Sequence, residues 1–292
     1  MKLKMFTMLI QTILLTACSL MPAPSADIYV YDYEKSVDYY GDCTLVRSGG
    51  QALLMDTCSA GAPVEEFLKE NGVEELSIYI SHYHNDHTGN AARIIRDMDV
   101  KTVYLPEASY MQEGYEGFDK HLADYHDILE AAGQKDCEIV WLDSGDSFDI
   151  GCAHFDVLLL NSGAEHGDFE DYDECSSYIN NCSLVTMMTC AGTRFLTAGD
   201  IERETEEKLL EDGYDIDADL FKMDHHGGET SNIEEFTDAV SPDCAFATYP
   251  GTKDEGWAAP IKRLSENCRV YNVYECGTTH LHVENGSIEE VQ

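Results

Sequence analysis

The sequence predicts an α/β fold in which two β-sheets lie between outer layers of helices. Apolar runs with strand character alternate with helical patterns in both halves of the chain, which is typical of sheets covered by helices. About 265 residues follow position 27, a length that α/β folds occupy as one domain. The sequence shows no internal repeat and no second linker. We therefore expect one domain over residues 28–292.

The N-terminal residues have the pattern of a lipoprotein signal peptide. Two lysines precede an apolar run from Met5 to Ala17, and Leu15-Thr16-Ala17-Cys18 resembles the lipobox of bacterial lipoproteins. The run is shorter than the ~20 residues that a transmembrane helix needs. We expect a signal peptide over 1–17, a lipid on Cys18 and a tether over 18–27. The resemblance implies an extracytoplasmic protein that is anchored to the bacterial cell membrane.

The first half of the domain begins with a predicted β-hairpin. The apolar runs 43–47 and 51–55 flank Ser48-Gly49-Gly50, which is a turn signal. Apolar and helical patterns then alternate up to residue 142. In order, they predict a helix over 63–71, a strand over 76–80, a helix over 91–97, a strand over 101–105, a helix over 115–132 and a strand over 138–142.

The second half repeats this alternation. It predicts strands over 154–160, 183–188 and 194–197, a helix over 202–210, a strand over 219–223, a helix over 232–240 and a strand over 244–248. Several of these strands end directly before acidic residues or histidines. Because α/β proteins build their sites at strand ends, we expect these polar groups to carry the function.

The charge balance restricts the partners of the protein. The chain has 18 basic and 56 acidic residues, which gives a net charge of −38. Removing Lys2 and Lys4 with the signal peptide makes it still more acidic. Such a surface repels polyphosphates, so it argues against long nucleic acid as the substrate and against docking on anionic lipids by charge. We expect a small-molecule or cell-envelope substrate; the oligomeric state does not follow from the sequence.

Ten cysteines remain besides Cys18, an even number that permits disulfides outside the cytoplasm. They form no Cys-x-x-Cys zinc pattern, and their connectivity does not follow from the sequence. The alternative is that many are buried free thiols. Cys175 and Cys182 flank a polar segment and are the pair to test first.

The segment Ser81 to Asn90 contains the pattern His82-x-His84-x-Asp86-His87 directly after a predicted strand. Zinc binds imidazole nitrogen and carboxylate oxygen at ~2.0–2.2 Å, and one loop here supplies four such groups. Asp200 follows the strand 194–197, and His225-His226 follow the strand 219–223. Three clusters at strand ends are what a two-metal site requires. We therefore expect two metal ions, Zn²⁺ first, with Mn²⁺ or iron as alternatives.

These motifs resemble the metallo-β-lactamase superfamily, whose fold is an αββα sandwich of two mixed sheets flanked by helices. The segments around Asp42, Asp56, His82, Asp200 and His225 are most similar to the hydrolase domain of ComEC-type competence proteins and to the phosphorylcholine esterases of teichoic acid. The resemblance covers residues 28–290. It implies a metal-dependent hydrolase.

The resemblance also implies roles for individual residues. His82 and His84 match the ligands of the first metal, and Asp86, His87 and His225 match those of the second. Asp200 matches the carboxylate that bridges both ions, and Asp56 matches an aspartate that supports the histidine loop. His226 is then expected to face the substrate and donate to a phosphoryl oxygen, while Asp86 orients the nucleophile.

One expected ligand has no clear match. The family's third histidine of the first metal site lies before the strand that precedes Asp200, and Asn180 stands near that place. His166 is the nearest histidine upstream, and a water is the third alternative, since a catalytic zinc keeps an open position. The late His-Pro pair of many competence proteins is Ala259-Pro260 here, which weakens the analogy with their nuclease domain.

The sequence thus predicts a lipid-anchored, extracytoplasmic dizinc hydrolase of a phosphodiester or a phosphorylated head group, with a metal-bound hydroxide as the nucleophile. Two alternatives stay open. The same metal core can hydrolyse a lactam, a lactone or a thioester, because fold does not fix substrate. A surface protein that binds metal without turnover is the second alternative.

Overall fold

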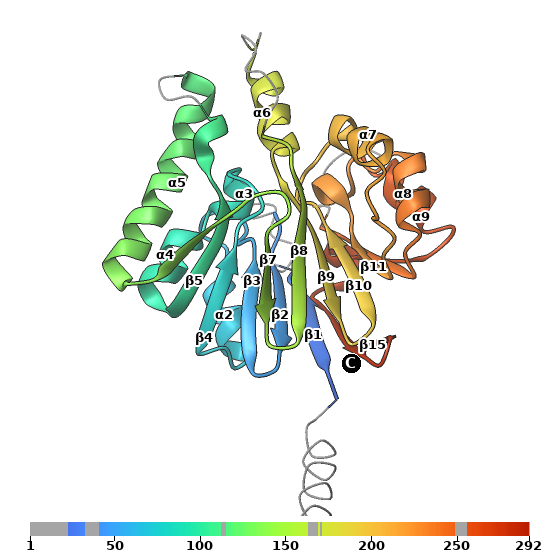
Figure 1. Ribbon diagram of the computed structural model, residues 1–292, viewed down its shortest axis with the longest axis horizontal. Helices are drawn as coiled ribbons and strands as arrows, with labels where there is room; N and C mark the ends of the chain where they lie inside the picture. The colour runs from blue at the N-terminus through green and yellow to red at the C-terminus, as the bar shows by residue number, and fades with distance from the viewer. Residues whose placement is uncertain are drawn as a thin grey trace, which may run out of the picture.

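Two mixed β-sheets pack face to face and carry helices on their outer faces (Figure 1). The computed structural model describes residues 23–32, 41–111, 115–162, 169, 171–248 and 256–291. The predicted signal peptide and Cys18 lie outside these ranges. No helix within them combines the length and the apolar character needed to cross a membrane.

The first sheet has the strand order β15-β14-β1-β2-β3-β4-β5-β6. Its strands β3 to β6 are parallel, and the other pairs are antiparallel. The strands are β1 (Ser25–Val30), β2 (Thr44–Ser48), β3 (Gln51–Met55), β4 (Glu75–Tyr79), β5 (Asp99–Pro106), β6 (Glu138–Leu142), β14 (Thr279–Glu284) and β15 (Ser287–Glu290). The predicted hairpin is β2 and β3, and Gly49 and Gly50 adopt the positive φ angles that its tight turn needs.

The second sheet has the order β13-β12-β11-β10-β9-β8-β7. Strands β10 to β13 are parallel, and strands β7 to β10 are antiparallel. The strands are β7 (Ser147–Ile150), β8 (Ala153–Leu160), β9 (Leu184–Cys190), β10 (Thr193–Thr197), β11 (Leu220–Lys222), β12 (Cys244–Ala247) and β13 (Arg269–Asn272). Each sheet therefore has one parallel part, and the parallel strands end in the loops that carry the site.

The helices cover both outer faces. Figure 1 shows α4 and α5 on one side and α7, α8 and α9 on the other, with α6 above the strands. The helices are α2 (Val64–Glu70), α3 (Asn85–Thr88), α4 (Ala91–Asp97), α5 (Glu116–Lys135), α6 (Tyr172–Asn181), α7 (Arg203–Glu211), α8 (Glu234–Val240), α9 (Ala259–Leu264) and α10 (Val273–Cys276), with 3-10 turns η1 (Ala108–Tyr110) and η2 (Asp224–Gly227).

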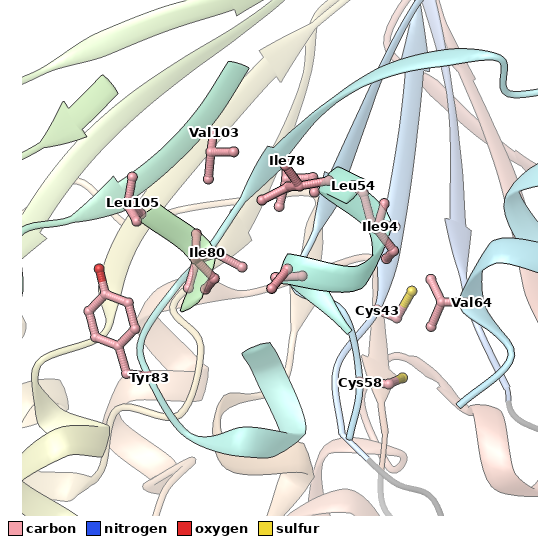
Figure 2. Packing of buried hydrophobic residues seen from close by; sticks show 14 of the residues in the cluster. Cys43, Leu54, Cys58, Val64, Ile78, Ile80, Tyr83, Ile94, Val103 and Leu105 are labelled. Atoms are coloured by element: carbon pink, nitrogen blue, oxygen red, sulfur yellow. The ribbon is translucent and has the colours of Figure 1, made fainter. Parts of the chain in front are cut away.

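Three apolar clusters hold these layers together. One joins the first sheet to α2, α4 and α5, one lies between the sheets, and one joins the second sheet to α7, α8 and α9. Figure 2 shows part of the first cluster, to which Ile78 and Val103 of the sheet and Ile94 of α4 belong. Tyr83 belongs to the same cluster although it lies between His82 and His84. The histidine loop is therefore anchored in the core.

The fold agrees with the predicted αββα sandwich, but several elements differ from the predicted ones. Strand β1 begins at Ser25, inside the predicted tether, because residues 25–30 pair with both β2 and β14. Helix α6 was not predicted; its first turn is capped by Asp171, whose side chain accepts from Glu174 N. All ten cysteines within the described ranges are free thiols, which was the alternative to disulfides that the sequence left open.

The suggested pair Cys175 and Cys182 is wrong for a geometric reason. Cys175 lies within α6 and Cys182 caps its end. Seven residues of α-helix span ~10 Å at ~1.5 Å per residue. A disulfide requires Cα atoms within ~7 Å of each other, so these two thiols cannot bond without unwinding the helix.

Candidate metal centre

The predicted metal residues meet where parallel strands of both sheets end. The histidine loop follows β4, Asp200 follows β10, and His225 and His226 lie in η2 after β11. Strand β4 pairs in parallel with β3 and β5, and β11 with β10 and β12. The carboxyl ends of parallel strands lie at one edge of each sheet, which brings these loops together.

His87 is buried, and a carboxylate fixes the orientation of its ring. Its Nδ1 lies 2.8 Å from Asp56 Oδ2. Asp56 also accepts from the Ser81 backbone N–H at 2.8 Å and from the Ser81 hydroxyl at 2.7 Å. Because a carboxylate only accepts, Nδ1 carries the proton and the Nε2 atom is left to face the site. Asp56 thus contacts the histidine loop and not the cavity.

His226 has the same arrangement with a different carboxylate. Its Nδ1 lies 3.1 Å from Asp42 Oδ1, which also accepts from the Thr248 hydroxyl. The Nε2 atom of His226 lies 3.1 Å from Asp86 Oδ2. Asp42 stays close because Gly41 has a φ of 113° and a Cβ there would lie 1.9 Å from the backbone oxygen of Asp86. A side chain at position 41 would therefore separate the two loops.

Asp200 lies between the two rings. Its Oδ2 atom is 3.1 Å from His87 Nε2 and 3.2 Å from His226 Nε2. Burial opposes ionisation of this carboxyl, but the His226 and His87 imidazoles and the Lys222 ammonium group outweigh burial and lower its pKa well below the usual range. Asp200 is therefore a buried carboxylate with two imidazole nitrogens at its oxygen.

Lys222 is a buried cation behind this group. Its Nζ forms an ion pair with Asp42 Oδ2, lies 3.5 Å from Asp200 Oδ1 and donates to the Gly199 carbonyl at 3.0 Å. The ammonium group offsets part of the charge of the two carboxylates, which would otherwise repel each other in the interior. Sequence reasoning did not find this role, because Lys222 appears there only as a strand residue.

The adjacent histidines lie at different distances from the other predicted site residues. The ligand atoms of Asp42, His87, Asp200 and His226 all lie within 4.8 Å of one another, and His225 is not in this group. His225 Nε2 lies 3.9 Å from Asp200 Oδ2, and its Nδ1 lies 2.7 Å from the Thr230 hydroxyl. His226 Nε2 lies 3.1 Å from Asp86 Oδ2 and 3.2 Å from Asp200 Oδ2, closer to these predicted ligands than His225 Nε2.

The remaining predicted ligands line the same region. The rings of His82 and His87 lie 4.2 Å apart, and those of His82 and His84 lie 4.8 Å apart, measured between centroids. His82 Nδ1 is 3.0 Å from the Ser81 hydroxyl, which donates to Asp56. This leaves the His82 Nε2 atom buried without a hydrogen-bond partner.

The two residues suggested as the third ligand of the first metal have different outcomes. Asn180 lies at the end of α6 beside the site; its Nδ2 donates to Glu202 Oε1 at 2.8 Å, and its Oδ1 is buried without a partner. His166 lies outside the described residues. Asn180 is therefore placed to offer an oxygen atom to the site.

A cavity of about 660 Å³ opens above these residues. It exposes both imidazole and carboxylate groups together with one lysine and two aromatic side chains. Its lining residues include His84, Asp86, Lys120, His121, Tyr172, Asp173, Ser176, Asn180, Asp200, Glu202, His225, His226, Thr230 and Trp257. A small molecule that enters it reaches Asp200 and His226 directly.

The unsatisfied polar atoms of the site fit divalent metal ions. The buried His82 Nε2, His87 Nε2 and Asp200 Oδ1 atoms make no hydrogen bond. His87 Nε2 lies 3.1 Å from Asp200 Oδ2 without the geometry of a hydrogen bond. Buried polar groups are seldom left unpaired, and separations of ~3 Å suit atoms that share one ion at ~2.0–2.2 Å. Asp42 is better explained as the partner of His226 Nδ1, since its oxygens are already occupied.

The chain is similar to several known proteins. The sequence model of the Metallo-beta-lactamase superfamily matches residues 37–155. ComE operon protein 3 of Bacillus subtilis (strain 168) is 29% identical over 224 residues, which cover 76% of this chain and 25% of the relative. Competence protein ComA of Neisseria gonorrhoeae is 24% identical and covers 84% of this chain and 29% of its own length.

A solved structure shows the same fold. CmlA, a diiron β-hydroxylase from Streptomyces venezuelae, superposes with a TM-score of 0.53 and 15% identity over 90% of this chain and 55% of CmlA. The chain spans about a quarter of the length of the curated relatives it matches, as the 25% and 29% coverages show.

Proposed function

The chain carries a metallo-β-lactamase superfamily domain, and we propose that it is a metal-dependent hydrolase of a phosphodiester or a phosphorylated head group. The observation that carries the proposal is the convergence of His87 Nε2 and His226 Nε2 on Asp200 Oδ2 at the cavity floor. Each ring is held through Nδ1 by a carboxylate, which is the arrangement of metal-binding histidines.

We assign two metal positions to these residues. His82 and His84 would hold the first ion, and Asp86, His87 and His226 would hold the second. Asp200, whose Oδ2 lies 3.1 Å from His87 Nε2 and 3.2 Å from His226 Nε2, is assigned as the carboxylate that both ions would share. A bound pair of divalent ions supplies an activated water at neutral pH and positive charge for the phosphoryl oxygens. Zinc suits these imidazole and carboxylate groups, and manganese or iron remain alternatives, since CmlA contains two irons.

The other groups of the site orient the substrate. The Thr230 hydroxyl at His225 Nδ1 leaves Nε2 of that ring directed toward Asp200 at 3.9 Å, on the cavity side. When Nδ1 accepts from Thr230, Nε2 carries the proton and can donate to a phosphoryl oxygen. The Trp257 ring packs edge-on against His225 with centroids 5.3 Å apart and limits its rotation.

The charge of the cavity favours a small substrate with a phosphoryl group. Bound metal ions would bring positive charge to its floor, and Lys120 is the one lysine or arginine among the lining residues that the structure describes. The protein as a whole is strongly acidic, which opposes long polyanions. The alternative substrates, a lactam, a lactone or a thioester, need no cation beyond the metals.

A paired variant tests the proposed activity. Asp200→Ala removes the carboxylate that would touch both ions, so we expect it to lose at least one metal equivalent by elemental analysis and more activity on bis(p-nitrophenyl) phosphate than any single histidine variant. Asp217→Ala changes an exposed aspartate and is the control. Retention of two metals and most activity in Asp200→Ala contradicts the site. Turnover of nitrocefin or lactones alone, or metal without any turnover, contradicts the substrate class.

We also propose that the protein is extracytoplasmic and held to the cell membrane by a lipid on Cys18. The motif Leu15-Thr16-Ala17-Cys18 after the apolar run supports this placement. Labelling cells with a palmitate analogue tests it, because the thioether requires the Cys18 sulfur. We expect Cys18→Ser to abolish the label on this protein; unchanged labelling contradicts the anchor.

A further inference from the structure

Helix α5 directs one histidine toward the histidine loop. His121 is 2% exposed, and it lines the cavity beside His84. The centroids of the two rings lie 4.9 Å apart, close to the 4.8 Å between His82 and His84. His84 therefore packs against two other imidazoles, one from its own loop and one from α5.

The hydrogen bonds of His121 leave its outer nitrogen free. Nδ1 lies 2.9 Å from the backbone oxygen of Tyr83, which can only accept, so Nδ1 carries the proton. Nε2 then has the lone pair, and it is buried without a hydrogen-bond partner. Burial lowers the pKa of His121 and favours this neutral form. A histidine that donates one N–H to a carbonyl and offers its other nitrogen has the form of a metal ligand.

The helix is fixed to the loop at more than one point. Asp124, three residues after His121, accepts from Asn85 Nδ2 and from the Thr88 hydroxyl, each at 3.4 Å. Residues three apart lie on the same face of a helix, so His121 and Asp124 both face the loop. The carbonyl that holds His121 belongs to Tyr83, the residue between His82 and His84. The imidazole is therefore held in position against that loop.

The first metal position lacks a third protein ligand in the sequence. Asn180 offers a carboxamide oxygen, whereas zinc and iron favour imidazole nitrogen. His121 supplies an imidazole nitrogen from helix α5. This helix comes much earlier in the chain than the segment before β10, where the family's third histidine is expected. Within the described residues, the ligand atoms of His82, His84 and His121 do not all lie within 4.8 Å of one another, so a shared ion there requires the imidazole rings to rotate.

We propose that His121 is a ligand of the metal ion held by His82 and His84. The proposal rests on the two-metal function above and adds a residue to it. It makes α5 part of the metal site, so that loss of this ion would also loosen the contact between α5 and the histidine loop.

Metal content and cobalt spectra of the full chain test the assignment. The variants are His121→Ala and His121→Gln, which keeps the side-chain bulk, with Asn180→Ala for comparison. His126→Ala is the control, since this exposed histidine lies on the same helix. Each protein is loaded with Co²⁺, dialysed and measured by elemental analysis and by visible absorption, which reports the ligands and geometry of the ion. Circular dichroism checks that each variant is folded.

We expect the wild type and His126→Ala to hold two ions with the same spectrum. Both His121 variants should lose one ion or bind it at least tenfold more weakly, with a changed cobalt spectrum. Two ions and a wild-type spectrum in His121→Gln would overturn the assignment, as would loss of the ion in Asn180→Ala alone. If the wild type binds fewer than two ions, the two-metal function itself fails.

Discussion

His87 and His226 present their Nε2 atoms to the same oxygen of Asp200, at 3.1 and 3.2 Å. The two histidines come from different sheets, one after β4 and one after β11. On the far side of each ring, a buried carboxylate holds Nδ1: Asp56 for His87 and Asp42 for His226. The centre of the site is thus two matching carboxylate and imidazole pairs that face one shared carboxylate.

Replacing each of the adjacent histidines should separate a metal ligand from a substrate contact. We expect His226→Ala to lose about one metal equivalent together with activity, because its Nε2 lies 3.1 and 3.2 Å from Asp86 and Asp200. His225→Ala should keep both ions and lose mainly kcat, with a cost of ~2.7–4 kcal/mol in transition-state stabilisation if its N–H supports the phosphoryl oxygen. Metal per mole of purified protein decides the matter; depletion in His225→Ala with full occupancy in His226→Ala would reverse the assignment.

Asp56→Asn should weaken metal binding without removing any ligand. The asparagine oxygen can still accept from Ser81, but its amide then donates to His87 Nδ1. His87 would shift its proton to Nε2, which then has no lone pair for the ion. We expect a ~10–100-fold loss of metal affinity, the usual effect of such partners.

Competition with a chromophoric chelator measures the affinity of Asp56→Asn. Asp27→Asn is the matched control, because Asp27 holds His280 and His282 on the exposed face of β1 and β14. Equal affinities in both variants and the wild type would exclude a positioning role for Asp56.

Much of the fold follows from local patterns. The hairpin of β2 and β3 is found within one residue of its predicted bounds, because a turn signal between two apolar runs depends only on neighbouring residues. Helix α6 was missed because its sequence is polar, with Cys175 and Ile179 as its buried apolar side. Such a short helix takes its stability from packing more than from its own sequence.

The sequence predicts the strand ends at which the site residues lie, but it does not give the directions of adjacent side chains there. Consecutive strand residues point to opposite faces, a rule that would apply to His225 and His226 if they continued β11. Both instead have positive φ angles, 47° and 61°, within the turn η2, so their directions do not follow that rule. Asp42 and Lys222 were missed because their roles depend on contacts between distant segments, which no local pattern records.

Metal binding should release protons and strengthen as pH rises. Burial opposes the charged form of His87, but Asp200 and Asp56 outweigh it and raise its pKa well above the usual range. The pKa of His226 is raised in the same way, with Asp200 and Asp42 as the partners. The metal-free site therefore holds protons at neutral pH that a metal ion must displace.

Calorimetry of zinc binding to the metal-free protein in two buffers of different ionisation enthalpy gives the number of protons released. We expect release at pH 7 that falls at higher pH, and a smaller value for His226→Ala, which lacks one of the two imidazoles. A binding enthalpy that does not depend on the buffer between pH 6 and 8 would show that these rings are already neutral.

Oxidation should join Cys152 to Cys190 and leave Cys175 and Cys182 reduced. The Cys152 and Cys190 sulfur atoms lie 3.6 Å apart. Burial would raise the pKa of the exposed Cys152, but hydrogen bonds with Ser48 and Cys190 outweigh it and lower that pKa. Burial raises the pKa of Cys190 to about 12. Cys152 is thus the attacking thiol, because the thiolate is the reactive form.

With oxidised glutathione as the oxidant, the Cys152 thiolate attacks one glutathione sulfur and releases one glutathione thiolate. Cys190, on losing its proton, then attacks the Cys152 sulfur and releases the second glutathione. We expect two fewer titratable thiols and a Cys152–Cys190 peptide in mass spectrometry. Cys152→Ser should block both changes, and Cys175→Ser should block neither. If Cys152→Ser loses two titratable thiols at the wild-type rate, the Cys152–Cys190 pairing is wrong. The pairing rests on the 3.6 Å distance between the two sulfur atoms.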